Sequence, residues 1–345
     1  MFEDMQIGMC VPCRTSLNEA RSYWRQMDQL GFDRIGIADT PMLAKEVYLS
    51  LGLAAMDSPK AKFILMVSNP ITRDITVTAG AIRGLLDVAG DRTIYGFGIG
   101  DSSVVGVGLR PAPIGRVGEY IASLRDILAG GTADFDGRKL RAAWGEWEPL
   151  VPRMMMGVGG ERNLRAAGRT ADVVMTTYGI LPNLVEKIHD LVHEGAVEAG
   201  RDPAAIDIWH LVTVMPGETL QEGFANINIL TQAKFFALHG DAGKNRPPEV
   251  QEALRRLAPL YGIDRHSGTN EEVWEIASET GTVDYFVQQA GGMVGPVDYT
   301  AAVERMRNAG VKNLMLVGLG PDKPALINAI GQATVCKRNI VSIAG

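Results

Sequence analysis

The chain has 345 residues, of which 46% are hydrophobic and 21% charged, and its formal net charge at pH 7 is −6. Acidic and basic residues are interspersed, so no basic face is offered to a phosphodiester backbone and we expect no nucleic-acid partner. Neither a run of about eighteen apolar residues nor the regions of a signal peptide is present, so we expect a cytoplasmic protein without membrane contact that acts on a small-molecule substrate.

Short apolar runs rich in β-branched residues alternate with longer segments of helical period, which predicts repeated β-α-β units. The first helix has clear ends, because Ser16 is a good N-cap and Gly31 a good stop. The predicted strands are residues 6–11, 34–38, 62–68, 93–98, 153–158, 173–177, 206–214 and 313–317. The predicted helices between them are residues 17–30, 42–56, 76–88, 114–129, 162–169 and 184–199.

Two segments break this alternation. Residues 133–148 contain turn-forming residues and two tryptophans, and we expect an inserted hairpin or lid there. The segment 219–309 is helical but too long for one crossover, and a pair of prolines interrupts it. We expect it to contain the seventh helix of the repeat and a helical insertion at residues 240–295, all within one domain spanning residues 1–345.

Eight strands that alternate with helices can form a closed barrel or an open doubly wound sheet. A dinucleotide-binding open sheet should carry GxGxxG directly after its first strand, whereas this chain has Cys10-Val11-Pro12-Cys13 there. We therefore predict an α/β fold of the (β/α)8 TIM-barrel class. The carboxyl ends of all eight strands then meet at one mouth, where the chemistry of such barrels takes place.

The ends of the second and third predicted strands carry polar side chains. Asp39 is a candidate acid, base or substrate anchor, or the cap of the following helix. Asn69 precedes a proline, and its amide offers a donor and an acceptor to the edge of a heterocycle, or closes an ordinary Asx turn. The residues alone leave both alternatives open at each position.

The ends of the fourth and fifth predicted strands are rich in glycine. Gly98, Gly100 and Asp101 form a GxGD sequence whose bare backbone suits a flat ring, with Asp101 or Ser102 as a polar contact or Asp101 as a turn former. The glycines within residues 157–160 precede a helix whose first amides have no partner, which suits a phosphate. A tight turn between strand and helix explains the same glycines.

Other patterns indicate no further catalytic or metal site. The CxxC of Cys10 and Cys13 has neither a helix directly after it nor a second ligand pair, and we interpret it as two small residues at a strand end. His189 and His193 are four apart on a helix without a third ligand, so we expect a surface pair rather than a metal site. Sequences of the GxSxG and GxxxxGK[ST] types are absent, and His210 is the one histidine that we consider for the mouth.

Four segments together resemble, in order and spacing, the bacterial-luciferase-like flavin-dependent oxidoreductase family over nearly the whole chain. These are GFDRIGI at residues 31–37, MVSNPITR at 66–73, GIGD at 98–101 and GVGG at 157–160. Within the family the chain is most similar to the branch of methylenetetrahydromethanopterin reductase, where GxGD and VTNP-like segments recur. The resemblance rests on the order of these four segments along the chain rather than on any one of them.

The resemblance implies FMN or the deazaflavin coenzyme F420 at the mouth, with the phosphate near residues 157–160. It also implies a strand bulge with a non-prolyl cis peptide between Met66 and Val67, behind the ring. The residues implied to bind the coenzyme are Met66, Val67, Ser68, Asn69, Gly98, Gly100, Asp101, Ser102, Gly157, Val158, Gly159, Gly160 and Tyr178.

The activity implied by the resemblance is that of a flavin-dependent oxidoreductase or monooxygenase, which uses reduced FMN on a small organic molecule and relies on a separate flavin reductase. The first alternative is an F420-dependent reductase or dehydrogenase that transfers only hydride. The second is a flavin-binding protein without turnover. Relatives are commonly homodimers or homotetramers, and the apolar faces at residues 42–56 and 76–88 would support a dimer or pack on the barrel.

The candidate catalytic residues are Asp39 and Thr40. Many relatives have a histidine where this chain has Thr40, and a threonine cannot act as a general base near neutral pH. A flavin performs hydride transfer or oxygen activation itself, so the protein then contributes mainly position and electrostatics. Candidate pocket walls, which equally suit ordinary packing, are Trp144, Trp147, Tyr178 and Trp209.

Overall fold

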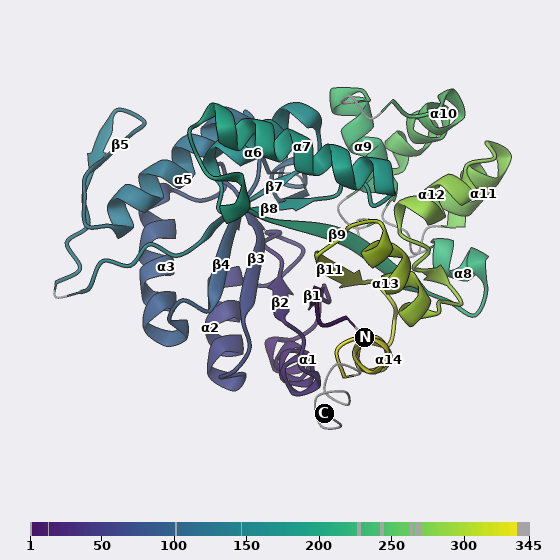
Figure 1. Cartoon of the computed structure of the whole chain (residues 1–345), viewed down its shortest axis with the longest axis horizontal. Coiled ribbons are helices and arrows are strands. Elements are labelled where there is room, and N and C mark those ends of the chain that lie inside the picture. Colours follow the sequence, from purple (N-terminus) through teal and green to yellow (C-terminus); the bar gives the residue numbers. More distant parts are fainter. Residues whose placement is uncertain are drawn as a thin grey trace.

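The computed structural model describes residues 2–12, 14–100, 102–145, 147–225, 229–241, 245–262, 265 and 271–336. Its centre is a closed barrel of parallel strands, because β9 pairs with both β8 and β11 (Figure 1). The strands are β1 (Gln6–Cys10), β2 (Arg34–Ile37), β3 (Phe63–Ser68), β4 (Thr93–Phe97), β7 (Met154–Val158), β8 (Val173–Thr176), β9 (Asp207–Pro216) and β11 (Asn313–Gly318). The predicted (β/α)8 class is confirmed, and no predicted strand end is wrong by more than two residues.

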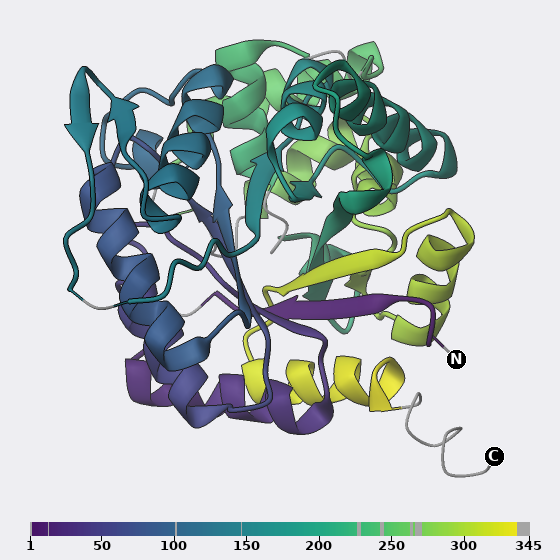
Figure 2. The ribbon, with the colours of Figure 1, turned by 60° about the vertical axis from the view of Figure 1, so that its left-hand side comes forward.

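Helices surround the barrel, and Figure 2 shows several of them along its outer face. They are α1 (Leu17–Leu30), α2 (Val47–Asp57), α3 (Ile75–Ala89), the short α4 (Ser102–Val105), α5 (Ile114–Leu128), α6 (Glu161–Thr170), α7 (Pro182–Glu198) and α14 (Lys323–Ala333). The ends of α1 are as predicted, since the Glu19 amide donates to Ser16 Oγ and Gly31 has φ 86°. The predicted start of α2 at residue 42 is wrong, because Met42 has φ 67° and Glu46 caps the helix instead.

Helices of the connection from β9 to β11 lie beside the barrel (Figure 1) and form a second apolar centre. This centre is built from α8 (Leu220–Ala225), α9 (Ile229–His239), α10 (Pro248–Leu257), α11 (Glu271–Glu279), α12 (Val283–Gln289) and β10 (Val294–Gly295), whereas the last helix of the connection, α13 (Tyr299–Asn308), packs in the main core. Phe224, Leu254 and Phe286 are buried in this centre. The long strand β9 joins the two parts, because Met215 and Pro216 at its end pair with β10.

Residues 133–148 contain a two-stranded hairpin, β5 (Ala133–Phe135) and β6 (Arg138–Leu140). The hairpin is fastened to the outer helices rather than to the mouth. Arg138 forms an ion pair of 2.8 Å with Asp74, the N-cap of α3, and the Arg116 guanidinium of α5 lies 3.8 Å from the centre of the Phe135 ring. A role as a lid stays a prediction.

Among the described residues, no helix is both long and apolar enough to cross a membrane. Within the described residues, Cys10, which is buried at the end of β1, and Cys336 form no disulfide. Cys13, the second cysteine of the CxxC, lies outside the described residues.

His210 lies on β9 but points away from the mouth. Its neighbours Trp209 and Leu211 belong to the apolar interior of the barrel, and successive side chains of a strand point to opposite sides. The fully buried His210 ring stacks on His189 of α7 at 6.2 Å, and its Nδ1 lies 3.3 Å from the Gly179 carbonyl oxygen. Burial lowers the pKa of His210 to about 4. The hypothesis that His210 serves the mouth is therefore wrong.

We expect the protein to lose stability as the pH falls from about 6.5 to about 4. The unfolded chain takes up a proton at residue 210 near pH 6.5, whereas the buried ring stays neutral down to about pH 4. The stabilisation is complete above the unfolded pKa and falls by up to about 3 kcal/mol on acidification. In urea unfolding across this range, His210→Gln should show a smaller decline than wild type, and the half-buried control His193→Gln should keep the full decline. An unchanged pH dependence in the His210 variant would contradict this account.

Candidate functional site

A cavity of about 1220 Å³ opens at the carboxyl ends of the barrel strands. Each of the eight strands, or the residue directly after it, contributes to its wall. These residues include Cys10, Ile37, Met66, Gly98, Val158, Thr177, Thr213 and Val317. The cavity thus occupies the mouth at which the strand ends were predicted to meet.

One wall of the mouth is formed by β3, β4 and β7, where glycines leave the backbone bare. A methyl group added at Gly98 or Gly157 would lie 2.9 Å from a methyl carbon of Val67, and one at Gly96 would lie 3.0 Å from it. Val67 therefore fits only because its neighbours have no side chains. The peptide between Met66 and Val67 is cis, as predicted, and the pairing of β3 with β4 shifts register between Leu65 and Ser68.

At one side of this wall, the loop after β7 leads directly into α6. The N-cap of α6 is Gly160, and no side chain caps the helix. The first amides of a helix have no partner within it, so this ten-residue helix presents free donors next to Gly159. The exposed Arg162 in its first turn also lines the cavity. This arrangement suits the phosphate of a ligand.

The acidic residue in the first turn of α6 is directed away from those donors. Glu161 Oε1 lies 2.6 Å from Lys187 Nζ and accepts a hydrogen bond of 3.2 Å from the Tyr178 hydroxyl. The hydrogen bond from Lys187 lowers the pKa of Glu161. Tyr178 is buried beside this pair and is not among the residues that line the cavity.

Asp39 is buried at the mouth and is bound by Arg73. Arg73 Nε and Nη2 donate to its two carboxylate oxygens at 2.9 and 3.0 Å. The alternative that Asp39 caps the next helix is wrong, because Glu46 occupies that position. Since both oxygens of Asp39 accept from a permanent cation, the geometry favours a structural anchor over an acid or base.

Arg73 also connects the loop after β2 to the start of α2. Its Nη2 lies 2.8 Å from Glu46 Oε1, while the other oxygen of Glu46 accepts the Leu49 amide. Its guanidinium carbon lies 5.1 Å from the centre of the Tyr48 ring. Burial lowers the pKa of Arg73, but the bonds to Asp39 and the charge of Glu46 outweigh it and the pKa is raised. Arg73 lies in the MVSNPITR segment at residues 66–73, but no local pattern indicates that its partner is Asp39, 34 residues away.

The β2–α2 loop that Arg73 fastens carries Thr40 into the cavity wall. The backbone carbonyl of Thr40 accepts the amides of Leu43 and Ala44 at 3.1 and 2.9 Å, which closes a turn. Thr40 and Leu43 both line the cavity. The loop is therefore an ordered part of the wall.

Asn69 forms the Asx turn that was one of its two alternatives. Its Oδ1 accepts the amides of Ile71 and Thr72, and its Nδ2 donates to Thr72 Oγ1 and Ser103 Oγ. Both Asn69 and Ser68 are fully buried and do not line the cavity. They support the wall from behind.

The glycine-rich segment after β4 turns sharply into α4. Gly100 has φ 86°, and a methyl group there would lie 2.2 Å from Val104 Cγ2, so only glycine fits. Ser102 and Ser103 are buried and line the cavity. Asp101, a predicted coenzyme contact, lies outside the described residues.

None of the four aromatic residues considered as pocket walls lines the cavity. Trp209 is buried inside the barrel, and Trp144 and Trp147 pack against each other after the hairpin. The aromatic lining comes instead from helices rather than from the strand ends. These residues are Trp24 of α1, Phe235 and Phe236 of α9, and Phe286 of α12.

The histidines of α7 form no metal site that the structure supports. His189 and His193 have ring centres 6.0 Å apart, and burial lowers the pKa of His189. In the described part of the chain, no group of three or more potential ligands is arranged to hold a metal ion.

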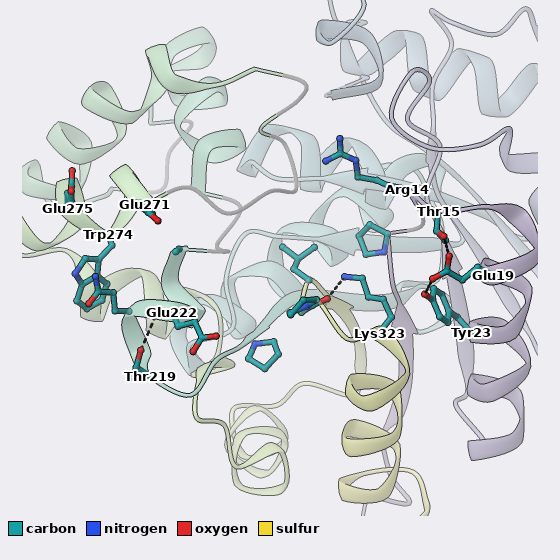
Figure 3. Close-up of a pocket in the computed structure, with 17 residues that line it drawn as sticks. Arg14, Thr15, Glu19, Tyr23, Thr219, Glu222, Glu271, Trp274, Glu275 and Lys323 are labelled. Atoms are coloured by element: carbon teal, nitrogen blue, oxygen red, sulfur yellow. Dashed lines mark hydrogen bonds between the residues drawn. The ribbon is translucent and has the colours of Figure 1, made fainter.

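A second, more polar hollow of about 840 Å³ adjoins the mouth (Figure 3). Figure 3 shows Glu222 of α8 and Glu271 of α11 on the opposite side of the hollow from Arg14. The residues that line both spaces are Pro12, Arg14, Thr15 and Leu319. The hollow therefore forms a charged approach to the mouth.

Comparisons with known proteins agree with this geometry. The model of a family described as luciferase-like monooxygenase matches residues 5–312. The 5,10-methylenetetrahydromethanopterin reductase of Methanolobus tindarius is 31% identical over 192 residues, which are 54% of this chain and 58% of that protein. The chain thus aligns with little more than half of that relative.

Two further similarities extend over most of the chain. The reductase of the same name from Methanopyrus kandleri is 24% identical over 323 residues, covering 83% of this chain and 85% of that protein. An F420-dependent secondary alcohol dehydrogenase, solved in complex with an F420-acetone adduct, has a TM-score of 0.71 and 16% identity. That similarity covers 96% of this chain and 99% of the dehydrogenase.

The contribution of the Asp39–Arg73 ion pair to the stability of the cavity wall can be tested by mutation. Arg73→Met would leave the Asp39 carboxylate buried without a partner, and we expect it to lower the free energy of unfolding by about 3–5 kcal/mol. The double variant Asp39→Leu with Arg73→Met should lose less, because no unpaired charge remains at position 39. Urea unfolding of both variants measures the difference. Equal losses in the two variants would contradict a buried, coupled pair.

Proposed function

The chain belongs to the luciferase-like monooxygenase family, and we propose that it is an oxidoreductase that holds reduced FMN or coenzyme F420 in the barrel mouth. The observation that carries the proposal is a smooth wall, in which the Val67 side chain lies over Gly98 and Gly157, beside an uncapped helix start within one cavity of about 1220 Å³. A smooth apolar wall of this kind can pack against the face of a ring, and the free amides of a helix start can donate hydrogen bonds to a phosphate. Both coenzymes have a ring and a phosphate, so the residues present fit either.

The chain's residues would bind the coenzyme at two places. The ring would lie against Val67, Gly98 and Gly157, and the first amides of α6, which follow Gly159 and Gly160, would hold the phosphate. Further contacts that we propose from the same lining are Met66, Gly100, Ser102 and Val158. Ser68, Asn69 and Tyr178 would act indirectly, by supporting this wall and the start of α6.

The bound coenzyme would supply the hydride or, as FMN, the activated oxygen. Asp39 has both oxygens bound to Arg73, and the Thr40 hydroxyl is no base near neutral pH. The protein's part would thus be to bind and orient the coenzyme and the substrate, with Asp39 and Thr40 shaping the wall rather than moving a proton.

Hydride transfer with F420 is supported by the relatives, which are named as reductases and as an F420-dependent dehydrogenase. The second candidate is a monooxygenase that uses reduced FMN, and the family description supports it. This second activity would need a separate flavin reductase.

Binding and oxygen uptake test the proposal together. The protein is mixed with reduced F420 and, separately, with reduced FMN, and we expect at least one to bind at micromolar concentration. Oxygen consumption above that of free FMN would identify the monooxygenase, and its absence with bound F420 would favour hydride transfer. If the wild-type protein binds neither coenzyme, the proposal fails.

A matched pair of variants at Gly159 tests the phosphate site. Gly159→Asp places a carboxylate at the start of α6, and we expect it to weaken coenzyme binding at least about fivefold. Gly159→Ala is the control, because a methyl group there would lie 3.5 Å from Thr177 Oγ1, an ordinary contact. Coenzyme titrations of both variants give the comparison, and an equal effect of Ala and Asp would argue against an anion site.

We also propose that α2 and α3 form an interface between two copies of the chain. Leu49 and Met56 of α2 are 54% and 71% exposed, and Val77 and Val88 of α3 are 60% and 45% exposed. So many exposed apolar side chains on neighbouring helices favour association, and cyclic dimers are the commonest homo-oligomers.

Charge placed on this surface should separate the copies. We expect Met56→Glu combined with Val77→Glu to shift the protein towards the monomer, because two buried carboxylates without partners oppose association. Sedimentation velocity across a concentration series measures the shift. Val197→Glu on α7, where the valine is 66% exposed, is the control and should leave the association unchanged. A wild-type protein that is monomeric at every concentration would refute the interface.

A further inference from the structure

We infer that an aromatic lobe of the mouth binds the apolar body of an uncharged substrate. The lobe consists of Ile229, Phe235 and Phe236 of α9, Phe286 of α12, Met215 at the end of β9 and Leu319 after β11. The inference deepens the proposed function by naming a substrate class, and it rests on that function only for the coenzyme beside the lobe.

The size of the cavity leaves room for this second molecule. A cavity for one small ligand usually measures roughly 300–1,000 Å³, whereas this one measures about 1220 Å³. The glycine wall and the start of α6 account for one part of the lining. The aromatic lobe lies on other elements, so a coenzyme held at the glycine wall does not explain it.

The two phenylalanines of α9 indicate which type of ligand the lobe binds. Ile229, Leu230 and Ala233 are buried and attach the helix to the second apolar centre. Phe235 and Phe236 are only half-buried and line the cavity. Aromatic surface left facing water is unfavourable, and burying it against an apolar ligand recovers that free energy.

The charged side chain beside Phe236 is paired within the protein. Arg246 forms an ion pair of 2.8 Å with Asp241 and lies 6.0 Å from the centre of the Phe236 ring. Among the described residues, the two carboxylates on the cavity lining, Asp39 and Glu161, are each paired with a cation. A charged substrate body would find no partner in the lobe, whereas a neutral apolar one needs none.

The polar hollow next to the mouth is less favourable than the lobe for the apolar body of a substrate. Its carboxylates, such as Glu222 and Glu271, prefer water or a polar group. An apolar chain is therefore held on the α9 side of Leu319, one of the four residues that line both spaces.

A series of straight-chain alcohols from 1-butanol to 1-octanol tests the inference by calorimetric titration of the full-length protein, with and without bound coenzyme. We expect the affinity to rise about threefold to fourfold with each methylene group, as burial of hydrocarbon predicts. Phe235→Ala and Phe236→Ala should each weaken 1-octanol binding about tenfold. The control Leu238→Ala, on the same helix with the leucine 48% exposed and outside the lining, should bind 1-octanol like wild type.

The outcomes separate this inference from the proposed function. An affinity that does not depend on chain length, or an equal loss in the Leu238 variant, would overturn the lobe even if coenzyme binds. Wild-type protein that binds 1-octanol in this way but neither coenzyme would support the lobe and refute the proposed function. Phe235→Leu and Phe236→Leu, which keep an apolar side chain of similar reach, replace the alanine variants if circular dichroism shows that those unfold.

Discussion

The close approach of β3, β4 and β7 at the mouth is the constraint on which the site depends. Val67 occupies the space that side chains at positions 96, 98 and 157 would otherwise fill. A single methyl group at any of the three would push Val67 or the strands apart, because packed interiors have no room to absorb it. The flat wall is thus a property of three strands at once, and the helix start after Gly160 takes its position from the same loop.

Around that wall, ion pairs hold the loops in place. Arg73 binds Asp39 at the end of β2 and Glu46 at the start of α2, and so holds both ends of the segment that carries Thr40. On the other side, Lys187 and Tyr178 turn Glu161 away from the helix amides. In both places a carboxylate near the mouth is bound within the protein, which leaves the cavity without an unpaired acid among the described residues.

Features that depend on neighbouring residues could be predicted from the sequence. The strands and most helices follow from apolar runs, hydrophobic periodicity and caps such as Ser16. The glycine-rich ends of β4 and β7 were identified from the order of their segments along the chain. The start of α2 was wrong because Met42 adopts a left-handed conformation that no local preference indicates. The partner of Asp39 and the position of Trp209 depend on contacts across the barrel, and Phe235 and Phe236 face the mouth only because a second apolar centre holds α9 there. Such long-range placement cannot be predicted from neighbours in the sequence.

The separation of the apolar centre around Phe224 and Phe286 from the apolar interior of the barrel also has an evolutionary consequence. Substitutions in one centre are expected to leave the packing of the other largely intact, since distant sites contribute nearly independently to stability. Substitutions can therefore accumulate in the residues that contact the substrate while those that contact the coenzyme are conserved. Proteins built in this way can acquire new substrates and keep the same coenzyme chemistry.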